Sequence, residues 1–308
     1  MKKKIIASIV FVFLAAAAVI YFAFPEVLFN ISISSMRSSA GLSKGSLQVD
    51  DHKVVFLEGG KGDTILLVHG FTADKDNWTR FSQFLTPKYR VVAIDLPGFG
   101  ESSKIESESY DIPAQVKRLD KIVTALGLES FHIAGNSMGG WIAGKYAVEY
   151  PQKVLSLGLL DTGGVVSCEK SEFRKLLDKG ENPLLLDSVE DFEKNMTFVF
   201  EKPPAIPGSI KRYLAKQAIA SKSFNAKVFN DIMKEGSLLE SDLQKIVAKT
   251  LVIWGDKDKL IHVSCVDVLL KGIKDSKAAI IKNCGHLPMI ERAEETAGHY
   301  LEFLKSIP

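Results

Sequence analysis

The string Gly135-Asn136-Ser137-Met138-Gly139 holds a serine with one glycine two residues before it and another two residues after it. It follows the apolar run Phe131–Ala134 and opens a segment with helical spacing, which predicts a sharp strand-to-helix turn with the serine at its tip. Glycines at these places let neighbouring backbone approach without Cβ clashes. A helix start also directs unpaired N–H groups at the site. The pattern predicts that Ser137 is a nucleophile.

A serine hydroxyl needs a base, and histidine is the usual one. Of the six histidines, His286 lies in a loop after the last strand-like run, Ala278–Lys282, and before the closing helix. In a parallel sheet that loop shares the carboxyl edge with the turn at Ser137. We therefore expect His286 to be the base, with His262, near the same edge, as a weaker second candidate.

The base in turn needs a carboxylate that fixes its tautomer and stabilises its charged form. Trp254-Gly255-Asp256-Lys257-Asp258 follows a strand-like run, so both of its aspartates belong to the same edge. The order serine, aspartate, histidine fits an α/β-hydrolase arrangement. We expect Asp258, further into the loop, to be the acid. Asp256 is the rival, and Asp161 after the run ending at Leu160 is a third candidate.

Acyl transfer also needs preorganised donors for the developing oxyanion. The backbone N–H of Met138, directly after the nucleophile, is one expected donor. The second is the N–H of Phe71, because His69-Gly70-Phe71 ends the strand-like run Ile65–Val68 at the same edge. His69 stands at the strand–loop junction, which favours an orienting, hydrogen-bonded role over a catalytic one.

Short β-branched runs alternate with segments of helical spacing after residue 50. Ile65–Val68 is apolar throughout, which is typical of a strand buried on both faces. The alternation predicts an α/β fold in which helices cover both faces of a mostly parallel sheet. We expect this domain to occupy residues 49–308. Between about 165 and 240 helix-like segments occur without a clear strand, which predicts a helical lid.

The N-terminus pairs Lys2–Lys4 with the uncharged stretch Ile5–Phe24. Twenty predominantly apolar residues at ~1.5 Å each cross a ~30 Å hydrocarbon core, so residues 1–25 are predicted to be a transmembrane anchor. The basic flank predicts a catalytic domain on the non-cytoplasmic side. A cleaved signal peptide with a site near Ala15–Ala18 is the alternative. Residues 26–48 are predicted to be a juxtamembrane connector on the lipid surface, or a short helix packed on the domain.

The formal net charge is +2, and Lys2–Lys4 supply three of the positive charges. The remaining chain is therefore near neutral and has no basic footprint for nucleic acid. Cys168, Cys265 and Cys284 are too few for a disulfide framework and are expected to be buried thiols. One disulfide, Cys265 to Cys284, is the alternative if the domain faces an oxidising compartment.

These motifs together resemble the α/β-hydrolase superfamily over residues ~50 to 308. Within it, the chain resembles bacterial lipases of the Moraxella lipase 3 type and membrane-anchored monoacylglycerol lipases. The narrower resemblance rests on the N-terminal anchor, on the Gly-Asn-Ser-Met-Gly-Gly string, and on the segment His69-Gly70-Phe71-Thr72-Ala73-Asp74-Lys75-Asp76-Asn77-Trp78. It implies hydrolysis of a lipid-like ester, such as an acylglycerol, without a cofactor or metal.

Two other functions compete with this interpretation. The Gly-Asn-Ser-Met-Gly-Gly string is also similar to that of carbon–carbon bond hydrolases of ring-cleavage products, although Phe71-Thr72-Ala73 replaces the Gly/Pro-rich segment usual there. A non-catalytic receptor held at a membrane is the other alternative, and an intact set of Ser137, Asp258 and His286 argues against it.

Overall fold

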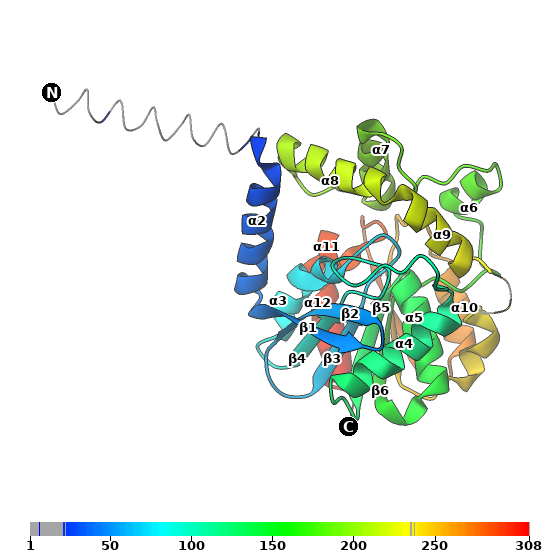
Figure 1. Cartoon of the computed structure of the whole chain (residues 1–308). Helices are drawn as coiled ribbons and strands as arrows, with labels where there is room; N and C mark the ends of the chain where they lie inside the picture. The colour runs from blue at the N-terminus through cyan, green and yellow to red at the C-terminus, as the bar shows by residue number, and fades with distance from the viewer. Residues whose placement is uncertain (1–5, 7–20, 22, 235, 237, 308) are drawn as a thin grey trace.

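A computed structural model of the chain describes residues 6, 21, 23–234, 236 and 238–307 (Figure 1). Its centre is one sheet in the order β1-β2-β4-β3-β5-β6-β7-β8. The strands are β1 (Leu42–Val49), β2 (His52–Gly59), β3 (Thr64–Val68), β4 (Arg90–Ile94), β5 (Phe131–Asn136), β6 (Val154–Leu160), β7 (Thr250–Gly255) and β8 (Ser276–Ile281). Strands β3 to β8 are parallel, and β1 and β2 add an antiparallel hairpin. The predicted mostly parallel sheet is confirmed.

The central strands are buried on both faces, which explains their apolar sequences. All of β3 is buried. Leu66 and Val68 belong to the core on one face, whereas Ile65 and Leu67 belong to the core on the other. Successive side chains of a strand point to opposite faces, so a strand covered on both sides must be apolar at every position.

Helices cover both faces of the sheet. On one face lie α4 (Ile112–Ala125), α5 (Met138–Glu149) and α10 (Cys265–Gly272). The other face is covered by α3 (Thr79–Leu85) and α12 (Ala293–Leu304), with the short α11 (Pro288–Glu291) beside them. The 3₁₀ turns are η1 (Lys75–Trp78), η2 (Pro151–Lys153) and η3 (Glu240–Lys245).

The segment between β6 and β7 contains the predicted lid. Its helices are α6 (Glu172–Leu177), α7 (Val189–Val199), α8 (Gly208–Ala220) and α9 (Lys222–Ile232), and no strand occurs in the part of this segment that the structure describes. In Figure 1 these helices gather above one end of the sheet. We call residues 165–240 the lid.

The expected connector, residues 26–48, contains a helix and a strand. Helix α2 (Pro25–Ser39) packs on the domain, as the alternative prediction for this segment had it, and β1 pairs with β2 along its whole length, so the sheet starts before residue 49. A two-residue turn joins β1 to β2, and β1 is an edge strand with several exposed positions. An exposed edge strand does not need the continuous apolar sequence of a central strand. The serine-containing sequence of this segment is therefore also compatible with a linker.

Helix α2 is fixed to the domain at two points. The Arg37 guanidinium donates two 2.6 Å hydrogen bonds to the Asp76 carboxylate, which follows β3 in the chain. Nearer the start of α2, the rings of Phe29 and Tyr213 on the lid helix α8 lie 5.7 Å apart. The helix therefore contacts both the sheet domain and the lid.

The predicted anchor, residues 1–25, lies almost entirely outside the described residues. Among the residues that the structure describes, no helix has both the length and the hydropathy needed to cross a bilayer.

Candidate active site

Ser137 occupies the junction between β5 and α5 in a left-handed backbone conformation, with φ 56° and ψ −121°. The turn is tight because both flanking glycines are pressed against backbone. A Cβ on Gly135 would lie 2.1 Å from the carbonyl oxygen of Gly139, and a Cβ on Gly139 would lie 2.2 Å from that of Val68. Only glycine fits at these two positions, so the spacing in the sequence reflects a steric requirement of the turn.

Backbone strain is concentrated at this edge of the sheet. Among the described residues other than glycine, those with a positive φ are Asp50, Thr72 (57°), Ser137 (56°), Asp161 (43°) and Asn283 (51°). All but Asp50, in the β1–β2 turn, follow the carboxyl ends of parallel strands. Such conformations cost of order 1–3 kcal/mol each and cluster at functional sites. The strain therefore marks the edge where the sequence places the reactive residues.

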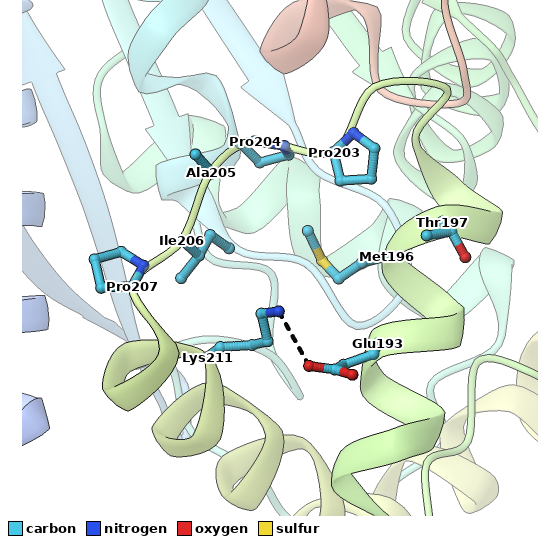
Figure 2. A pocket seen from close by; sticks show the side chains of 9 residues that line it. All are labelled: Glu193, Met196, Thr197, Pro203, Pro204, Ala205, Ile206, Pro207 and Lys211. Carbon is cyan, nitrogen blue, oxygen red and sulfur yellow. Dashed lines mark hydrogen bonds and ion pairs between the residues drawn. The ribbon is translucent and has the colours of Figure 1, made fainter.

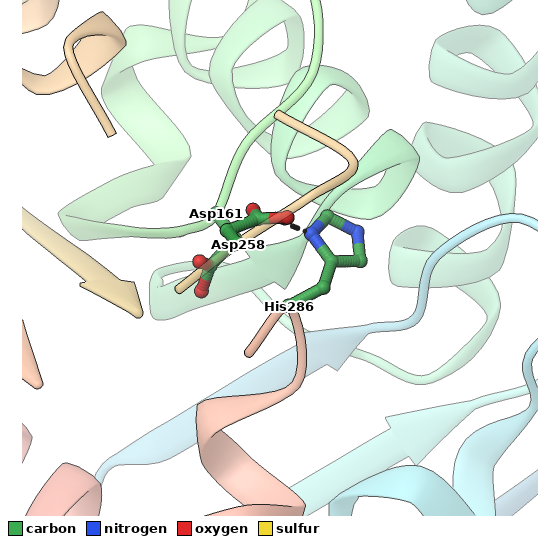
Figure 3. Close-up of side chains that lie close together, drawn as sticks. All are labelled: Asp161, Asp258 and His286. Atoms are coloured by element: carbon green, nitrogen blue, oxygen red, sulfur yellow. Dashed lines mark hydrogen bonds and ion pairs between the residues drawn. The ribbon is translucent and has the colours of Figure 1, made fainter. Parts of the chain in front are cut away.

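His286 and Asp258 form a buried pair (Figure 3). The Nδ1 atom of His286 lies 2.7 Å from Oδ2 of Asp258. Oδ1 of Asp258 accepts the backbone N–H groups of Leu260 (2.8 Å) and Ile261 (3.1 Å). A carboxylate held in this way takes a proton on Nδ1 and leaves Nε2 as the acceptor. Nε2 is buried and has no hydrogen-bond partner among the described residues, so it is free to accept a proton.

The main chain of His286 is held from two sides. Its N–H donates to the carbonyl of Val199 in the lid (2.9 Å), and its carbonyl accepts from Nδ2 of Asn136 (3.1 Å). Asn136 directly precedes Ser137, so the elbow and the histidine loop are joined at this point. The Ser137 hydroxyl is not hydrogen-bonded to Nε2 in this structure. Such bonds are often loose without substrate and tighten when it binds.

The two rival aspartates occupy different environments. Asp256 lies 3.6 Å from the surface ammonium of Lys282. Asp161 lies beside the pair: its carboxylate, that of Asp258 and the imidazole of His286 have ligand atoms within 4.8 Å of one another (Figure 3). Burial, and then the negative charge of Asp258, raise the pKa of Asp161 well above its ordinary value. The geometry therefore places Asp161 behind the pair formed by Asp258 and His286.

The expected oxyanion loop lies against the nucleophile. A Cβ on Gly70 would lie 3.1 Å from Cβ of Ser137, which places the backbone preceding Phe71 beside the elbow. His69 is fully buried; its Nδ1 lies 2.7 Å from the Gly70 carbonyl, and its Nε2 accepts the Leu96 N–H at 3.0 Å. Burial lowers the pKa of His69, which favours the uncharged ring. The ring supports this loop through its two hydrogen bonds. The roles of the Phe71 and Met138 N–H groups stay predictions.

The cysteines pair differently from the predicted alternative. Cys168 and Cys265 form a disulfide, whereas Cys284 is a free, buried thiol. The expectation of buried free thiols is therefore wrong for Cys168 and Cys265 and holds for Cys284, and the suggested Cys265–Cys284 pair is wrong. Cys265 belongs to the core on one face of the sheet and Cys284 to the core on the other. The sheet separates them, and a linear sequence does not reveal this.

His262, the second candidate for the base, is hydrogen-bonded elsewhere. Its Nδ1 lies 2.8 Å from the Ser264 hydroxyl, beside the disulfide. Glu291 is a residue of the site that no sequence motif indicates: its carboxylate accepts a hydrogen bond from the N–H of Gly285, next to His286. A glutamate five residues after the histidine at the end of a short helix gave no distinct signal.

The fold and this arrangement together define the class of protein. Residues 63–293 match a family model described as the alpha/beta hydrolase fold, and the chain belongs to this family.

Several members of this family are similar to the chain over most of its length. Lipase 3 of Moraxella sp. (strain TA144) is 38% identical over 275 residues, which cover 87% of this chain and 86% of that protein. Monoacylglycerol lipase ABHD6 of Mus musculus is 31% identical over 297 residues, covering 92% and 88%. A crystal structure of a membrane phospholipase A, described as a bacterial virulence factor, is 46% identical and superposes with a TM-score of 0.91 over 99% of both chains. The predicted resemblance to both types of lipase is confirmed.

Proposed function

We propose that the protein is a serine hydrolase that cleaves carboxylic esters of lipid-like molecules, among them acylglycerols, through an acyl-enzyme on Ser137. The observation that carries the proposal is the buried pair of His286 and Asp258, with a free Nε2, joined through Asn136 to the strained elbow at Ser137. The lipases among the relatives support an ester substrate.

The proposed reaction proceeds in two halves. Nε2 of His286 takes the proton of the Ser137 hydroxyl as Oγ attacks the ester carbonyl, and Asp258 stabilises the resulting imidazolium. The N–H groups of Met138 and Phe71 hold the oxyanion. The tetrahedral intermediate collapses as His286 gives its proton to the leaving alcohol. Water, activated by the same base, then attacks the acyl-enzyme and releases the acid. No cofactor or metal takes part in this scheme.

A fluorophosphonate probe tests the nucleophile. We expect the wild-type chain to be labelled and Ser137→Ala to be unlabelled and inactive, with Ser223→Ala, an exposed serine of α9, as the matched control. Labelling of Ser137→Ala at the wild-type rate would overturn the proposal.

A substrate panel tests the ester class. It contains monoacylglycerols, phospholipids, aryl esters of increasing chain length, and a carbon–carbon cleavage substrate. We expect turnover of the esters, with a preference for apolar acyl chains. Turnover of the carbon–carbon substrate alone would replace the lipase assignment with the alternative hydrolase activity.

We also propose that residues 1–25 anchor the protein in a membrane and that the catalytic domain, residues 49–308, lies on the non-cytoplasmic side. The disulfide between Cys168 and Cys265 supports this side, because disulfides persist in oxidising compartments. The whole protein should stay with membranes after a carbonate wash. Release as a shortened chain would instead indicate a cleaved signal peptide.

A further inference from the structure

One short stretch of the lid lies directly on the loop that carries His286. The His286 N–H donates to the carbonyl of Val199, which ends α7. Gly285 is pressed against the same stretch: a Cβ there would lie 2.5 Å from the Val199 carbonyl oxygen and 2.8 Å from the Glu201 nitrogen. The lid and the histidine loop therefore touch backbone to backbone, and this close approach requires glycine at position 285.

The Glu291 carboxylate is hydrogen-bonded to both of these segments. Its Oε2 accepts the N–H of Gly285 at 3.0 Å and the N–H of Glu201 at 3.2 Å. Its Oε1 accepts the N–H of Lys202 at 2.8 Å. One carboxylate thus accepts three backbone N–H groups, one from the histidine loop and two from the lid. Hydrogen bonds to a carboxylate are stronger than those to neutral acceptors, and here they join the histidine loop to the solvent-exposed start of the following lid segment.

We propose that lid residues 199–202 and Glu291 form a clip that positions His286, so that the placement of the lid and the orientation of the base are coupled. The proposal rests on the function above, in that it takes His286 as the base. Glu291 is a positioning residue in this scheme. In this scheme the lid helps to position the base.

The physical reason lies in the backbone groups that would lose their partners. If residues 199–202 moved away, the N–H of His286 would lose its acceptor, and the Glu291 carboxylate would lose two of its three donors. The His286 N–H is buried, so leaving it unpaired is unfavourable, whereas water can replace the exposed partners of Glu291 on the lid side. The loop would relax to recover these bonds, and the imidazole would turn with it, away from the Ser137 elbow.

The clip lies next to a cavity in the lid (Figure 2). This cavity has a volume of about 660 Å³ and lies between α7 and the start of α8. Its walls include Thr197, just before the clip, and Pro203, just after it. An ion pair between Glu193 and Lys211, 3.0 Å apart, bridges the two helices across it. No triad residue lines the cavity. A shift of α7 relative to α8 would move Thr197 and Pro203, which flank the clip on either side. The clip would then move with them and change the position of His286.

Variants that remove single contacts of the clip test the proposal in the full-length protein. Glu291→Ala removes all three acceptors, and Glu291→Gln keeps one acceptor oxygen. Lys202→Pro removes one donor N–H from the lid side, while its matched control, Lys202→Ala, keeps that N–H. Glu294→Gln, at an exposed position on α12, controls for the loss of a nearby charge. A soluble short-chain aryl ester serves as the substrate, with enzyme counted by end-point fluorophosphonate labelling.

We expect kcat to fall about tenfold in Glu291→Ala, which corresponds to ~1.4 kcal/mol of barrier, and by a smaller factor in Glu291→Gln and in Lys202→Pro. KM should stay within about twofold, because the ester itself does not touch the clip. Lys202→Ala should lose less activity than Lys202→Pro, because it keeps the N–H, and Glu294→Gln should match the wild type. Since the two sites share one contact, the double variant Glu291→Ala/Lys202→Pro should be no slower than Glu291→Ala alone.

Unchanged kcat per labelled site in Glu291→Ala, with only a lower melting temperature, would overturn the clip and leave the proposed function intact. Strictly additive losses in the double variant would also overturn it. Failure of the proposed function has a different signature, namely full turnover by Ser137→Ala.

Discussion

Nδ1 of His286 lies 2.7 Å from Oδ2 of Asp258, and the carboxyl group of Asp161 lies close to both. Asp258 accepts two backbone N–H groups and lies within hydrogen-bond distance of the imidazole. Asp161 accepts only the N–H of Gly255, at 2.9 Å, and its other oxygen is buried without a partner among the described residues. Two neighbouring buried carboxyls cannot both ionise readily, and burial and the charge of Asp258 raise the pKa of Asp161 well above its ordinary value.

This difference predicts unequal effects of removing either carboxyl group. Asp258→Asn should lower kcat by roughly a thousandfold or more, because an amide favours the wrong tautomer of the base. Asp161→Asn should retain kcat within about threefold. An amide has nearly the same shape as the raised-pKa carboxyl group, and its oxygen can still accept the Gly255 N–H. Steady-state kinetics on a soluble ester measures both.

Asp256→Asn is the control for the acid assignment, because Asp256 lies near Lys282 and is expected to behave like the wild type. A larger loss in Asp161→Asn than in Asp258→Asn would reassign the acid to the end of β6.

The disulfide predicts a redox-dependent stability. Cys168 and Cys265 are 97 positions apart in the chain and join the start of the lid to α10. A disulfide typically contributes about 2–4 kcal/mol, and more for longer loops. Cys168→Ser and reduced wild type should therefore melt at lower temperatures than oxidised wild type. Non-reducing electrophoresis should show a mobility change on reduction in wild type and in Cys284→Ala but none in Cys168→Ser. A shift retained by Cys168→Ser would refute the pairing.

The Arg37–Asp76 contact predicts how firmly α2 is held. Both side chains are largely buried, and the two bonds form the paired geometry that guanidinium and carboxylate favour. Arg37→Ala should lower the free energy of unfolding by about 1–3 kcal/mol, measured by chemical denaturation in detergent. Arg37→Lys should be intermediate, since an ammonium lacks the planar fork. An unchanged denaturation midpoint in Arg37→Ala would mean that α2 is held by other contacts.

Two buried histidines predict a loss of stability in mild acid. Burial lowers the pKa of both His69 and His132 below the ordinary 6.5. Below that pH the unfolded chain binds protons that the folded chain does not, so unfolding becomes easier as pH falls through about 6.5. Melting temperatures between pH 8 and 5 should fall, and His132→Gln should reduce the slope. An identical slope in that variant would exclude His132 as a source.

The sequence by itself determined the class of fold and the identity of the candidate triad. The apolar runs at β3, β5 and β7 reflect strands buried on both faces, and the glycines around Ser137 reflect backbone contacts near 2 Å that no side chain permits. Such features are local, because they depend on steric and burial constraints within a few neighbouring residues.

Only the tertiary structure decided which distant groups meet. It placed Cys265 and Cys284 on opposite faces of the sheet, joined the last part of the expected connector to the sheet as an edge strand, and brought Glu291 into contact with both the lid and the His286 loop. Each of these contacts joins segments far apart in the chain or separated by the sheet. Their residues carry no periodic or compositional signal, because a single hydrogen bond or disulfide between two segments requires only that folding bring them together.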